Sequence, residues 1–267
     1  MLIAQISDMH VKADGELLYR RIDTAGYLER AVAHLNALDP RPELVLATGD
    51  LVEAGKPEEY ARLRRLLAPL AMPVYLIPGN HDAREALRAA FADHAYLPRR
   101  GFLQYTVENL PVRLIALDTL VPGKTHGELC AERLDWLEAR LGESGRPTIL
   151  FLHHPPFDCG IAAFDGHRLS AGDQRLAELV RRHGNVERAM CGHVHRPIQV
   201  RWAGTMASIA PSTAHQATLD LHDDAPFSMM MEPPGVALHL WRPGTGLITH
   251  MSYIGTYEGP SPFRPTQ

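Results

Sequence analysis

Short apolar runs in this chain end in polar residues that packing alone does not require. Residues 74–77 (VYLI) have the composition of a buried strand, and Pro78 and then Gly79-Asn80-His81-Asp82 follow them. Gly permits a tight turn, while Asn and His supply an amide oxygen and an imidazole nitrogen. In α/β proteins ligands collect at the carboxyl ends of the strands. The pattern therefore predicts a sheet that delivers polar groups to one edge.

Four other apolar runs end in the same way. Their polar ends are Asp8-Met9-His10, Gly49-Asp50, His153-His154 and Gly192-His193-Val194-His195. Asp8 and His10 are two positions apart, so on extended chain both side chains would point to the same side. We expect seven side chains to face one cleft: Asp8, His10, Asp50, Asn80, His153, His193 and His195.

Helical and extended patterns alternate through most of the chain. Between the apolar runs 2–7 and 44–48, Leu28, Val32 and Leu35 have the spacing of one helix face. This order is that of a βαβ unit. Further helices are predicted from Pro57 onward and at 82–91, 131–141 and 174–183, with strands at 147–152 and 188–191. Residues 102–107 and 112–117 predict a hairpin, which would make the α/β sheet mixed.

After Pro197 the pattern changes to short strands without helices between them. These strands are predicted at 198–202, 205–209, 236–241 and 247–253, and we interpret them as a second, antiparallel sheet. Residues 157–170 form an irregular stretch long enough for a substrate loop. We expect one domain over residues 1–258, including a cap-like loop at 211–234, and a C-terminal tail at 259–267.

Net charge and cysteine content limit the partners and the compartment. The formal net charge of −4 gives no basic field for long nucleic acid. The N-terminus lacks the features of a signal peptide, and no apolar stretch approaches the length of a membrane span. Three cysteines in unrelated surroundings fit reduced thiols better than a disulfide framework. We therefore expect a cytoplasmic protein with no membrane partner.

Seven donors in one cleft are too many for one metal ion. Two ions about 3.5–4 Å apart and bridged by a carboxylate would use them all. His, Asp and Asn donors without Cys suit Mn, Fe, Zn or Co. Two adjacent cations lower the pKa of water held between them, so hydroxide becomes available near neutral pH. Phosphorus with two non-bridging oxygens is the natural target for such a hydroxide.

The five motifs together resemble the signature of the calcineurin-like metallophosphoesterases. The sequences His153-His154-Pro155-Pro156 and Thr213-Ala214-His215-Gln216 resemble most the bacterial branch that contains class III cyclic-nucleotide phosphodiesterases and a binuclear glycerophosphodiesterase. The resemblance implies a four-layer α/β/β/α sandwich of two mixed sheets with flanking helices. The metal site would lie where the two sheets meet.

The resemblance also implies a role for each residue of the motifs. Asp8, His10 and His195 would hold one ion, Asn80, His153 and His193 the other, and Asp50 would bridge the pair, two ions of divalent or mixed-valence type. His81 would face the phosphoryl group, where it would stabilise charge or protonate the leaving oxygen, and His215 would line the same pocket. His154 would orient a ligand. By residue type alone, His126, His167 and His222 are interpreted as surface or loop histidines.

The expected function is hydrolysis of small phosphodiesters by attack of a metal-bound hydroxide on phosphorus, with glycerophosphodiesters and cyclic nucleotides both open as substrates. A diester is favoured over a monoester because a second negative charge needs additional cationic donors, and Lys occurs only at positions 12, 56 and 124. Three alternatives stay open: a phosphomonoesterase or a nuclease of the same superfamily, and a non-catalytic protein-binding scaffold. A homo-oligomer is also open, with the late strands and loop as a subunit contact.

Overall fold

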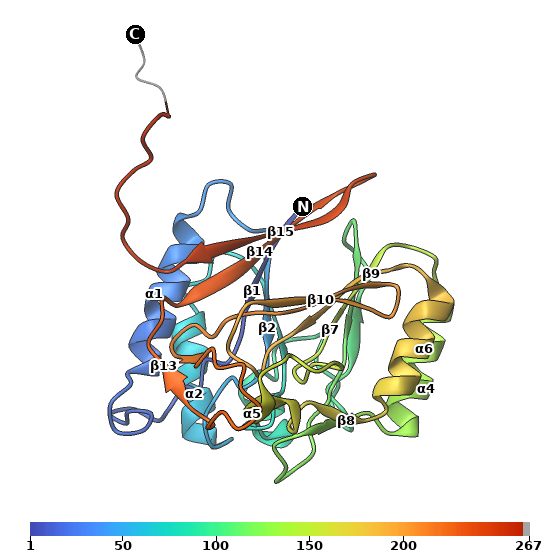
Figure 1. Ribbon diagram of the computed structural model, residues 1–267, viewed down its shortest axis with the longest axis horizontal. Coiled ribbons are helices and arrows are strands. Elements are labelled where there is room, and N and C mark those ends of the chain that lie inside the picture. The colour runs from blue at the N-terminus through green and yellow to red at the C-terminus, as the bar shows by residue number, and fades with distance from the viewer. Residues whose placement is uncertain (264–267) are drawn as a thin grey trace.

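Two mixed β-sheets form the centre of the computed structural model, which describes residues 1–263 (Figure 1). The first sheet has the strand order β15-β14-β1-β2-β3. Its parallel strands are β1 (Leu2–Ile6), β2 (Leu44–Thr48) and β3 (Val74–Ile77). The antiparallel pair β14 (Gly235–Arg242) and β15 (Gly246–Tyr253) extends the sheet beside β1. This sheet therefore contains the first and the last strands of the chain.

The second sheet has the strand order β10-β11-β9-β7-β5-β4. Its strands are β4 (Tyr105–Val107), β5 (Arg113–Ala116), β7 (Thr148–Phe151), β9 (Val186–Cys191), β10 (Ile198–Trp202) and β11 (Thr205–Ile209). The four central strands are parallel, and β4 and β10 run antiparallel at the two edges. The predicted hairpin at 102–107 and 112–117 is confirmed, because β4 pairs with β5.

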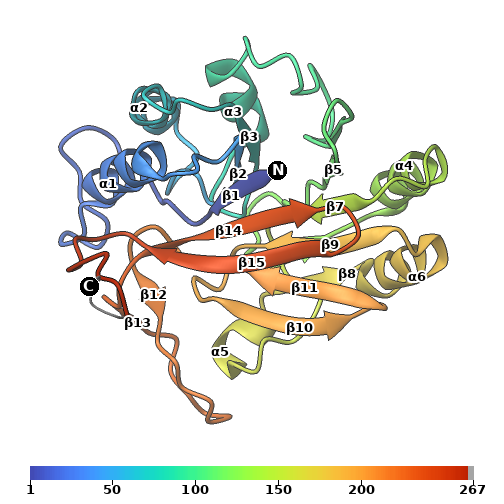
Figure 2. The same cartoon turned by 90° about the horizontal axis from the view of Figure 1, so that it is seen from above.

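Helices cover the outer face of each sheet (Figure 2). On the first sheet these are α1 (Thr24–Ala37), α2 (Pro57–Leu67) and α3 (Arg84–Ala90). On the second sheet they are α4 (Ala131–Gly142) and α6 (Asp173–His183). All five predicted helices are present, and the four-layer α/β/β/α arrangement is confirmed.

The alternation of side chains in β5 shows why the central strands are largely apolar. Leu114 packs into the cluster that contains Ile3 and Met190, where the two sheets face each other. Ile115 points to the opposite side and packs with Leu137 of α4 and other residues under the helices. A strand buried on both faces favours apolar residues on both sides. The layers on either side of the sheet thus account for the continuous apolar runs in the sequence.

The prediction that the late strands form one separate sheet is wrong. β10 and β11 join the second sheet, because β11 pairs in parallel with β9. β14 and β15 join the first sheet, because β14 pairs antiparallel with β1. Without the late strands, β1 and β9 would lie at sheet edges with unpaired backbone N–H and C=O groups. The late strands form hydrogen bonds with these groups. The predicted strands are present, but the pattern of apolar residues does not specify which strand each of them pairs with.

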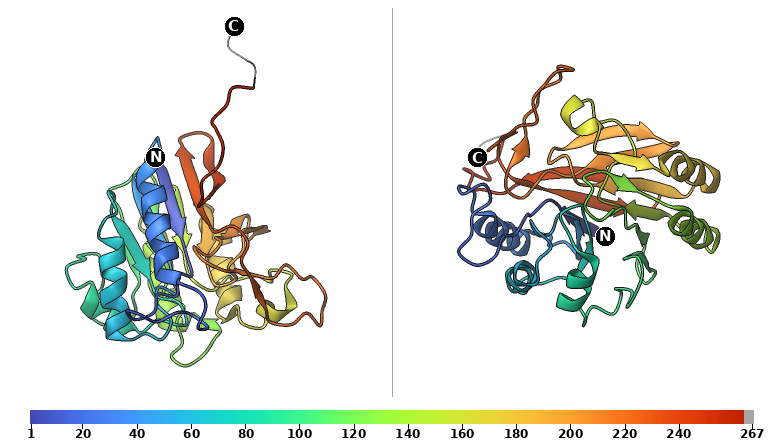
Figure 3. Two further views of the ribbon diagram at one scale, coloured as in Figure 1. Left: turned by 90° about the vertical axis from the view of Figure 1, so that its left-hand side faces the viewer. Right: turned by 90° about the horizontal axis from the view of Figure 1, so that it is seen from below.

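Two loops carry short elements that the sequence pattern did not predict. The stretch 157–170 contains α5 (Ala162–Asp165) and the start of β8 (Leu169–Ala171), which pairs with β6 (Gly127–Glu128). The loop 211–234 contains β12 (Gln216–Ala217), which pairs with β13 (Met229–Met230). Seen from below, α5 in yellow and the orange part of this loop project on the same side of the molecule (Figure 3).

The chain leaves the sheets after β15. Residues 259–263 of the predicted tail are exposed, and residues 264–267 lie outside the described residues. The division into one domain at 1–258 and a tail stays a prediction. Within residues 1–263, none of the helices combines the length and the apolar character needed to cross a lipid bilayer.

Candidate metal centre

The seven predicted donors come together where the parallel strands of the two sheets end. Asp8 and His10 follow β1, Asp50 follows β2 and Asn80 follows β3, while His153 follows β7 and the pair His193 and His195 follows β9. Six of the side chains belong to buried residues, and Asn80 is half-buried. The first sheet thus contributes four donors and the second sheet three. Their role as metal ligands stays a prediction, which the geometry described next supports.

Five of these residues have a left-handed backbone conformation. The φ angles are 53° at Asp8, 44° at His10, 46° at Asp50, 75° at His193 and 55° at His195. The expectation that Asp8 and His10 lie on extended chain is therefore wrong. Each such conformation costs about 1–3 kcal/mol in a non-Gly residue and is found mainly at functional sites. The chain turns sharply at these points, so that donors from several strands reach one place.

Close packing of the turns explains two of the glycines. A Cβ atom at Gly79 would lie 2.2 Å from Asp50 Oδ1, and one at Gly192 would lie 2.0 Å from Ser7 Oγ. Both distances are too short for any side chain. Glycine at these positions lets the turns after β3 and β9 approach the first-sheet donors.

In the first half of the cluster, two imidazole nitrogens face each other. His10 Nε2 lies 3.1 Å from His195 Nε2, and His195 Nε2 lies 3.3 Å from Asp8 Oδ1. The opposite ring nitrogens are both occupied as donors: His10 Nδ1 donates to Glu53 Oε2 at 2.8 Å, and His195 Nδ1 donates to the carbonyl of His215 at 3.1 Å. Neutral rings in these tautomers present two lone pairs to each other. Such an arrangement fits a cation between them.

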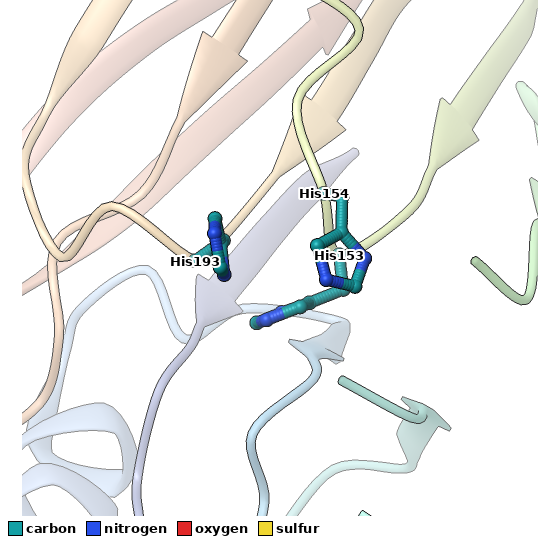
Figure 4. A group of neighbouring side chains, drawn as sticks. All are labelled: His153, His154 and His193. Carbon is teal, nitrogen blue, oxygen red and sulfur yellow. The ribbon is translucent and has the colours of Figure 1, made fainter. Parts of the chain in front are cut away.

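The second half of the cluster has a neutral amide at its centre. Asn80 Oδ1 lies 3.2 Å from His153 Nε2 and 3.1 Å from His193 Nδ1. His153 Nδ1 donates to the carbonyl of Thr48 at 2.8 Å, and its Nε2 atom faces the amide oxygen. Figure 4 shows the rings of His153, His154 and His193. The rings of His153 and His154 are turned 84° apart. One ring nitrogen of His153 and one of His193 thus converge on the same amide oxygen.

Asp50 lies between the two halves. Its Oδ2 atom is 3.3 Å from His153 Nε2 and 3.7 Å from His10 Nε2. Its Oδ1 atom accepts a hydrogen bond from the backbone N–H of His81 at 2.9 Å. One carboxylate oxygen is thus directed at predicted metal ligands from both sheets, which is the position that a bridging ligand requires.

The electrostatics of the cluster favour positive charge. Burial alone would lower the pKa of His153, but the Asp50 carboxylate, with Asp8 behind it, raises the pKa to about 9. Burial alone would raise the pKa of Asp8, but His195 outweighs it and lowers the pKa to about 2. The residues present therefore fit metal ions, and their nitrogen and oxygen donors suit Mn, Fe, Zn or Co.

Two further histidines border the first half. His81 Nδ1 donates to the backbone carbonyl of Glu53 at 2.8 Å. Burial alone would lower the pKa of His81, but the Asp50 and Glu53 carboxylates outweigh it and raise the pKa. Burial, followed by the His195 and His10 rings, lowers the pKa of His215 to about 2. Of the two rings, His81 is therefore the one that its surroundings favour in the charged form.

Asp82 holds the turn that carries Asn80 and His81. It accepts hydrogen bonds from the backbone N–H groups of Gly79 at 2.8 Å and Leu51 at 3.1 Å, and from the Tyr60 hydroxyl at 2.8 Å. Burial, and then the Asp50 carboxylate, raises the pKa of Asp82 to about 7. Its side chain ties the loop after β3 to the loop after β2.

A pocket of about 540 Å³ opens onto the cluster. Five of the donors line it, together with His81 and His215. The other lining residues are Tyr19, Thr125, Phe164, His167, Ala217, Phe227, Ser228 and Met229. In the described part of the chain, no Lys or Arg is among the lining residues. The volume is that of a site for a small molecule.

Several residues of this pocket were missed by sequence reasoning. His167, interpreted as a surface or loop histidine, lines the pocket, and its Nδ1 atom is 2.7 Å from Thr125 Oγ1. Phe227 packs on Phe164 with ring centroids 4.7 Å apart, so the loop 211–234 closes one side of the pocket. Long loops give no local signal for such contacts. Glu53 could have been suspected, because a carboxylate three residues after Asp50 is in reach of the same histidines.

His154 lies behind the cluster. Its Nδ1 atom is 2.7 Å from Thr119 Oγ1, and burial, reinforced by His193 and His153, lowers its pKa far below the usual range. The ring is fully buried and does not line the pocket. Its predicted role in orienting a ligand stays a prediction.

Comparisons with known proteins give consistent results. The family model described as calcineurin-like phosphoesterase matches residues 1–197. A protein of Arcobacter nitrofigilis named "Probable glycerophosphodiester phosphodiesterase GpdQ" is 41% identical, over 98% of this chain and 97% of its own length. The 3',5'-cyclic adenosine monophosphate phosphodiesterase CpdA of Escherichia coli is 32% identical, over 80% of this chain and 76% of its own length.

A solved structure gives the same fold. The dimetal phosphatase from Danio rerio superimposes with a TM-score of 0.66 and 16% sequence identity. The match covers 96% of this chain and 99% of that chain. At this level of identity the likeness concerns the fold alone.

Proposed function

Since the chain belongs to the calcineurin-like phosphoesterase family, we propose that it hydrolyses small phosphodiesters with two metal ions. The chain is a metal-dependent phosphodiesterase, as its relatives named for that activity indicate. The use of two ions rests on one observation above all: the carboxylate of Asp50 lies between two groups of closely spaced nitrogen and oxygen atoms.

Each group of donors would hold one ion. Asp8, His10 and His195 would hold the first, Asn80, His153 and His193 the second, and Asp50 would contact both. Bound at these positions, two ions would supply a hydroxide near neutral pH and Lewis acidity toward the phosphoryl oxygens. The protein contributes the fixed positions of the donors, which strained backbone and buried hydrogen bonds maintain.

The histidines of the pocket would act on the leaving group. His81 Nδ1 donates to the carbonyl of Glu53. The other ring nitrogen of His81, Nε2, therefore points away from that carbonyl. An alkoxide leaving group has a high pKa, so a proton from His81 would speed its departure. His215 borders the same side of the pocket and would contribute to binding the ester.

The charge and size of the pocket support a small diester as substrate. A monoester has two negative charges, and a pocket lined without Lys or Arg in the described residues offers no cationic side chain for the second. The net charge of −4 and the pocket volume of about 540 Å³ argue against a nuclease for long chains. The full set of converging donors argues against a scaffold without catalysis.

The first candidate substrate is a glycerophosphodiester. The relative with that name is 41% identical over nearly the whole of both chains, whereas a relative named as a probable cyclic nucleotide phosphodiesterase is 35% identical over a similar share of both chains. A cyclic nucleotide is the second candidate, supported by the cyclic-nucleotide names among the relatives. A cytoplasmic location and a homo-oligomer belong to the same proposal.

A substrate panel tests this proposal. Metal-free protein would be loaded with Mn, Co, Zn or Fe and assayed with glycerophosphocholine, cyclic AMP, p-nitrophenyl phosphate and duplex DNA. We expect the highest kcat/KM for glycerophosphocholine and about two ions per chain by elemental analysis. A preference for p-nitrophenyl phosphate or DNA would overturn the substrate class, and binding of no more than one ion per chain at saturating metal would overturn the binuclear site.

A further inference from the structure

Glu53 contacts both a predicted metal ligand and the pocket histidine. Its Oε2 atom accepts a hydrogen bond from His10 Nδ1 at 2.8 Å. Its backbone carbonyl accepts a hydrogen bond from His81 Nδ1 at 2.8 Å, and Oε2 lies 3.5 Å from the same nitrogen. The rings of His10 and His81 are packed edge to face with centroids 4.7 Å apart. Glu53 therefore fixes one nitrogen of each ring.

The hydrogen-bond partner of His10 differs from those of His195 and His153, two other predicted metal ligands. His195 Nδ1 donates to the backbone carbonyl of His215, and His153 Nδ1 donates to that of Thr48. His10 donates instead to a carboxylate, which makes the opposite ring nitrogen more basic and a better ligand. The His10 side chain is 5% exposed and that of Glu53 is 20% exposed, so little water screens the contact.

The backbone of Glu53 is anchored to the segment that carries His10. The N–H of Glu53 donates to the carbonyl of Val11 at 3.2 Å, and Val11 and Val52 form a parallel bridge. On the other side, the N–H of Ala54 donates to Glu59 Oε2 at 2.8 Å. The loop between β2 and α2 is therefore fixed on both sides of Glu53.

We propose that Glu53 is a positioning residue that sets the geometry between the metal site and the pocket histidine. Its carboxylate orients His10 and increases its strength as a ligand, while its main-chain carbonyl holds His81 at a fixed distance from the same ring. The inference rests on the proposed function, because it requires His10 to bind an ion. It assigns separate tasks to the side chain and to the main chain of one residue.

Metal binding by Glu53 variants tests the task of the side chain. Metal-free protein would be titrated with Zn²⁺ or Co²⁺ against a chromophoric chelator, for wild type, Glu53→Ala and Glu53→Gln. We expect Glu53→Ala to weaken one of the two sites by about 10–100-fold and to leave the other unchanged. Glu53→Gln should have a smaller effect, because an amide oxygen still accepts from His10 Nδ1. Glu16→Ala, which removes an exposed carboxylate bonded to Lys12, is the matched control and should bind as wild type does.

Two further measurements separate positioning from general stability and test the main-chain task. The thermal unfolding midpoint of metal-free Glu53→Ala should stay near that of wild type, whereas a purely structural role would lower it. The ratio of rates on alkyl and aryl diesters should change far less than in His81→Ala, because the carbonyl that holds His81 is retained.

The outcomes distinguish the inference from the proposed function. If wild type binds two ions and Glu53→Ala binds both with unchanged affinity, the side chain has no such task and the inference is wrong. A Glu53→Ala variant that changes the alkyl-to-aryl ratio as strongly as His81→Ala would refute the division between side chain and main chain. A wild type that binds fewer than two ions contradicts the proposed function itself.

Discussion

The two halves of the donor cluster differ in charge. Around His10 and His195 the third donor is the carboxylate of Asp8, whereas around His153 and His193 it is the neutral amide of Asn80. Asp50 is directed at both halves. A carboxylate attracts a cation more strongly than an amide oxygen does. We therefore expect one tighter and one weaker site, both dependent on the same central carboxylate.

The halves also differ in what surrounds them. The His10 ring lies 4.7 Å from His81 and 5.6 Å from His215, between ring centroids. The His193 ring instead lies 6.3 Å from Phe164, on which Phe227 packs. Groups that can transfer protons thus border one half, and an aromatic wall borders the other. On the proposed function, we expect the leaving alcohol to face His81 and the retained part of the ester to face the aromatic wall.

Removal of the shared carboxylate should abolish the difference between the halves. In Asp50→Ala both sites lose a ligand, so we expect the loss of both ions and a fall in kcat/KM of at least about 10³-fold. Elemental analysis and diester kinetics measure the two effects. Asp14→Ala, which changes an exposed ion pair with Arg62 and Arg65, is the control. Two retained ions with full activity would refute the bridging role of Asp50.

Removal of His81 tests whether the leaving group faces the histidine side. His81→Ala should slow diesters with alkyl leaving groups by about 10²–10⁴-fold, the range for a general acid, and activated aryl diesters far less. The measurement is kcat/KM for a matched alkyl and aryl series. His222→Ala, at an exposed ring outside the pocket, serves as control. Equal losses on both series would leave His81 with an electrostatic or positioning role.

Removal of the amide should affect the weaker half alone. We expect Asn80→Ala to lower the affinity for one ion by about 10–100-fold, and activity to recover when excess metal is added. A metal titration followed by activity and by bound-metal analysis measures both. If activity does not recover at any metal concentration, Asn80 acts on the substrate and the comparison of weak and tight sites loses its basis.

A buried histidine outside the site differs from the histidines of the cluster in its hydrogen-bond partners. On β14, His239 is fully buried, with its Nε2 atom 3.1 Å from Gln5 Oε1 and its Nδ1 atom 2.8 Å from Thr249 Oγ1. Both ring nitrogens therefore have partners within the protein, unlike His193, whose Nε2 atom is buried without one in the described part of the chain. Burial, and then Arg188, lowers the pKa of His239 from 6.5 to about 3. This histidine needs no cation to be stable.

The pH dependence of stability follows from that pKa. Between pH 6.5 and about pH 3 the unfolded chain binds a proton at His239 that the folded chain does not bind. The free energy of unfolding therefore falls as the pH falls through this range, by up to about 1.4 kcal/mol per pH unit. The free energy of unfolding, measured with urea on metal-free protein, should depend less steeply on pH in His239→Gln than in wild type. His250→Gln, at an exposed position on β15, should keep the pH dependence of wild type. An unchanged slope in His239→Gln would contradict the burial of a neutral ring.

Local sequence was sufficient for the main helices and strands and for the polar groups that gather at the strand ends. The run Val74–Ile77 is apolar at every position because it is buried between layers, and the residues after it serve another purpose. The same reasoning applies to Asp8, Asp50 and His153, each of which follows a buried strand. Residue type and position next to a strand end are properties of a few neighbouring residues, so they can be recognised without knowledge of the fold.

The tertiary structure alone decided which strands pair, how the turns are shaped and what closes the pocket. β11 and β14 join different sheets, because β11 pairs with the nearby strand β9, whereas β14 pairs with β1 at the other end of the chain. The left-handed turns at Asp8 and His193 persist because packing from both sheets over-determines them. Glu53 reaches His10, and Phe227 reaches Phe164, only after loops separated by dozens of residues have come together. Such contacts depend on the free energy of the whole packed molecule, and no short segment of the sequence encodes them.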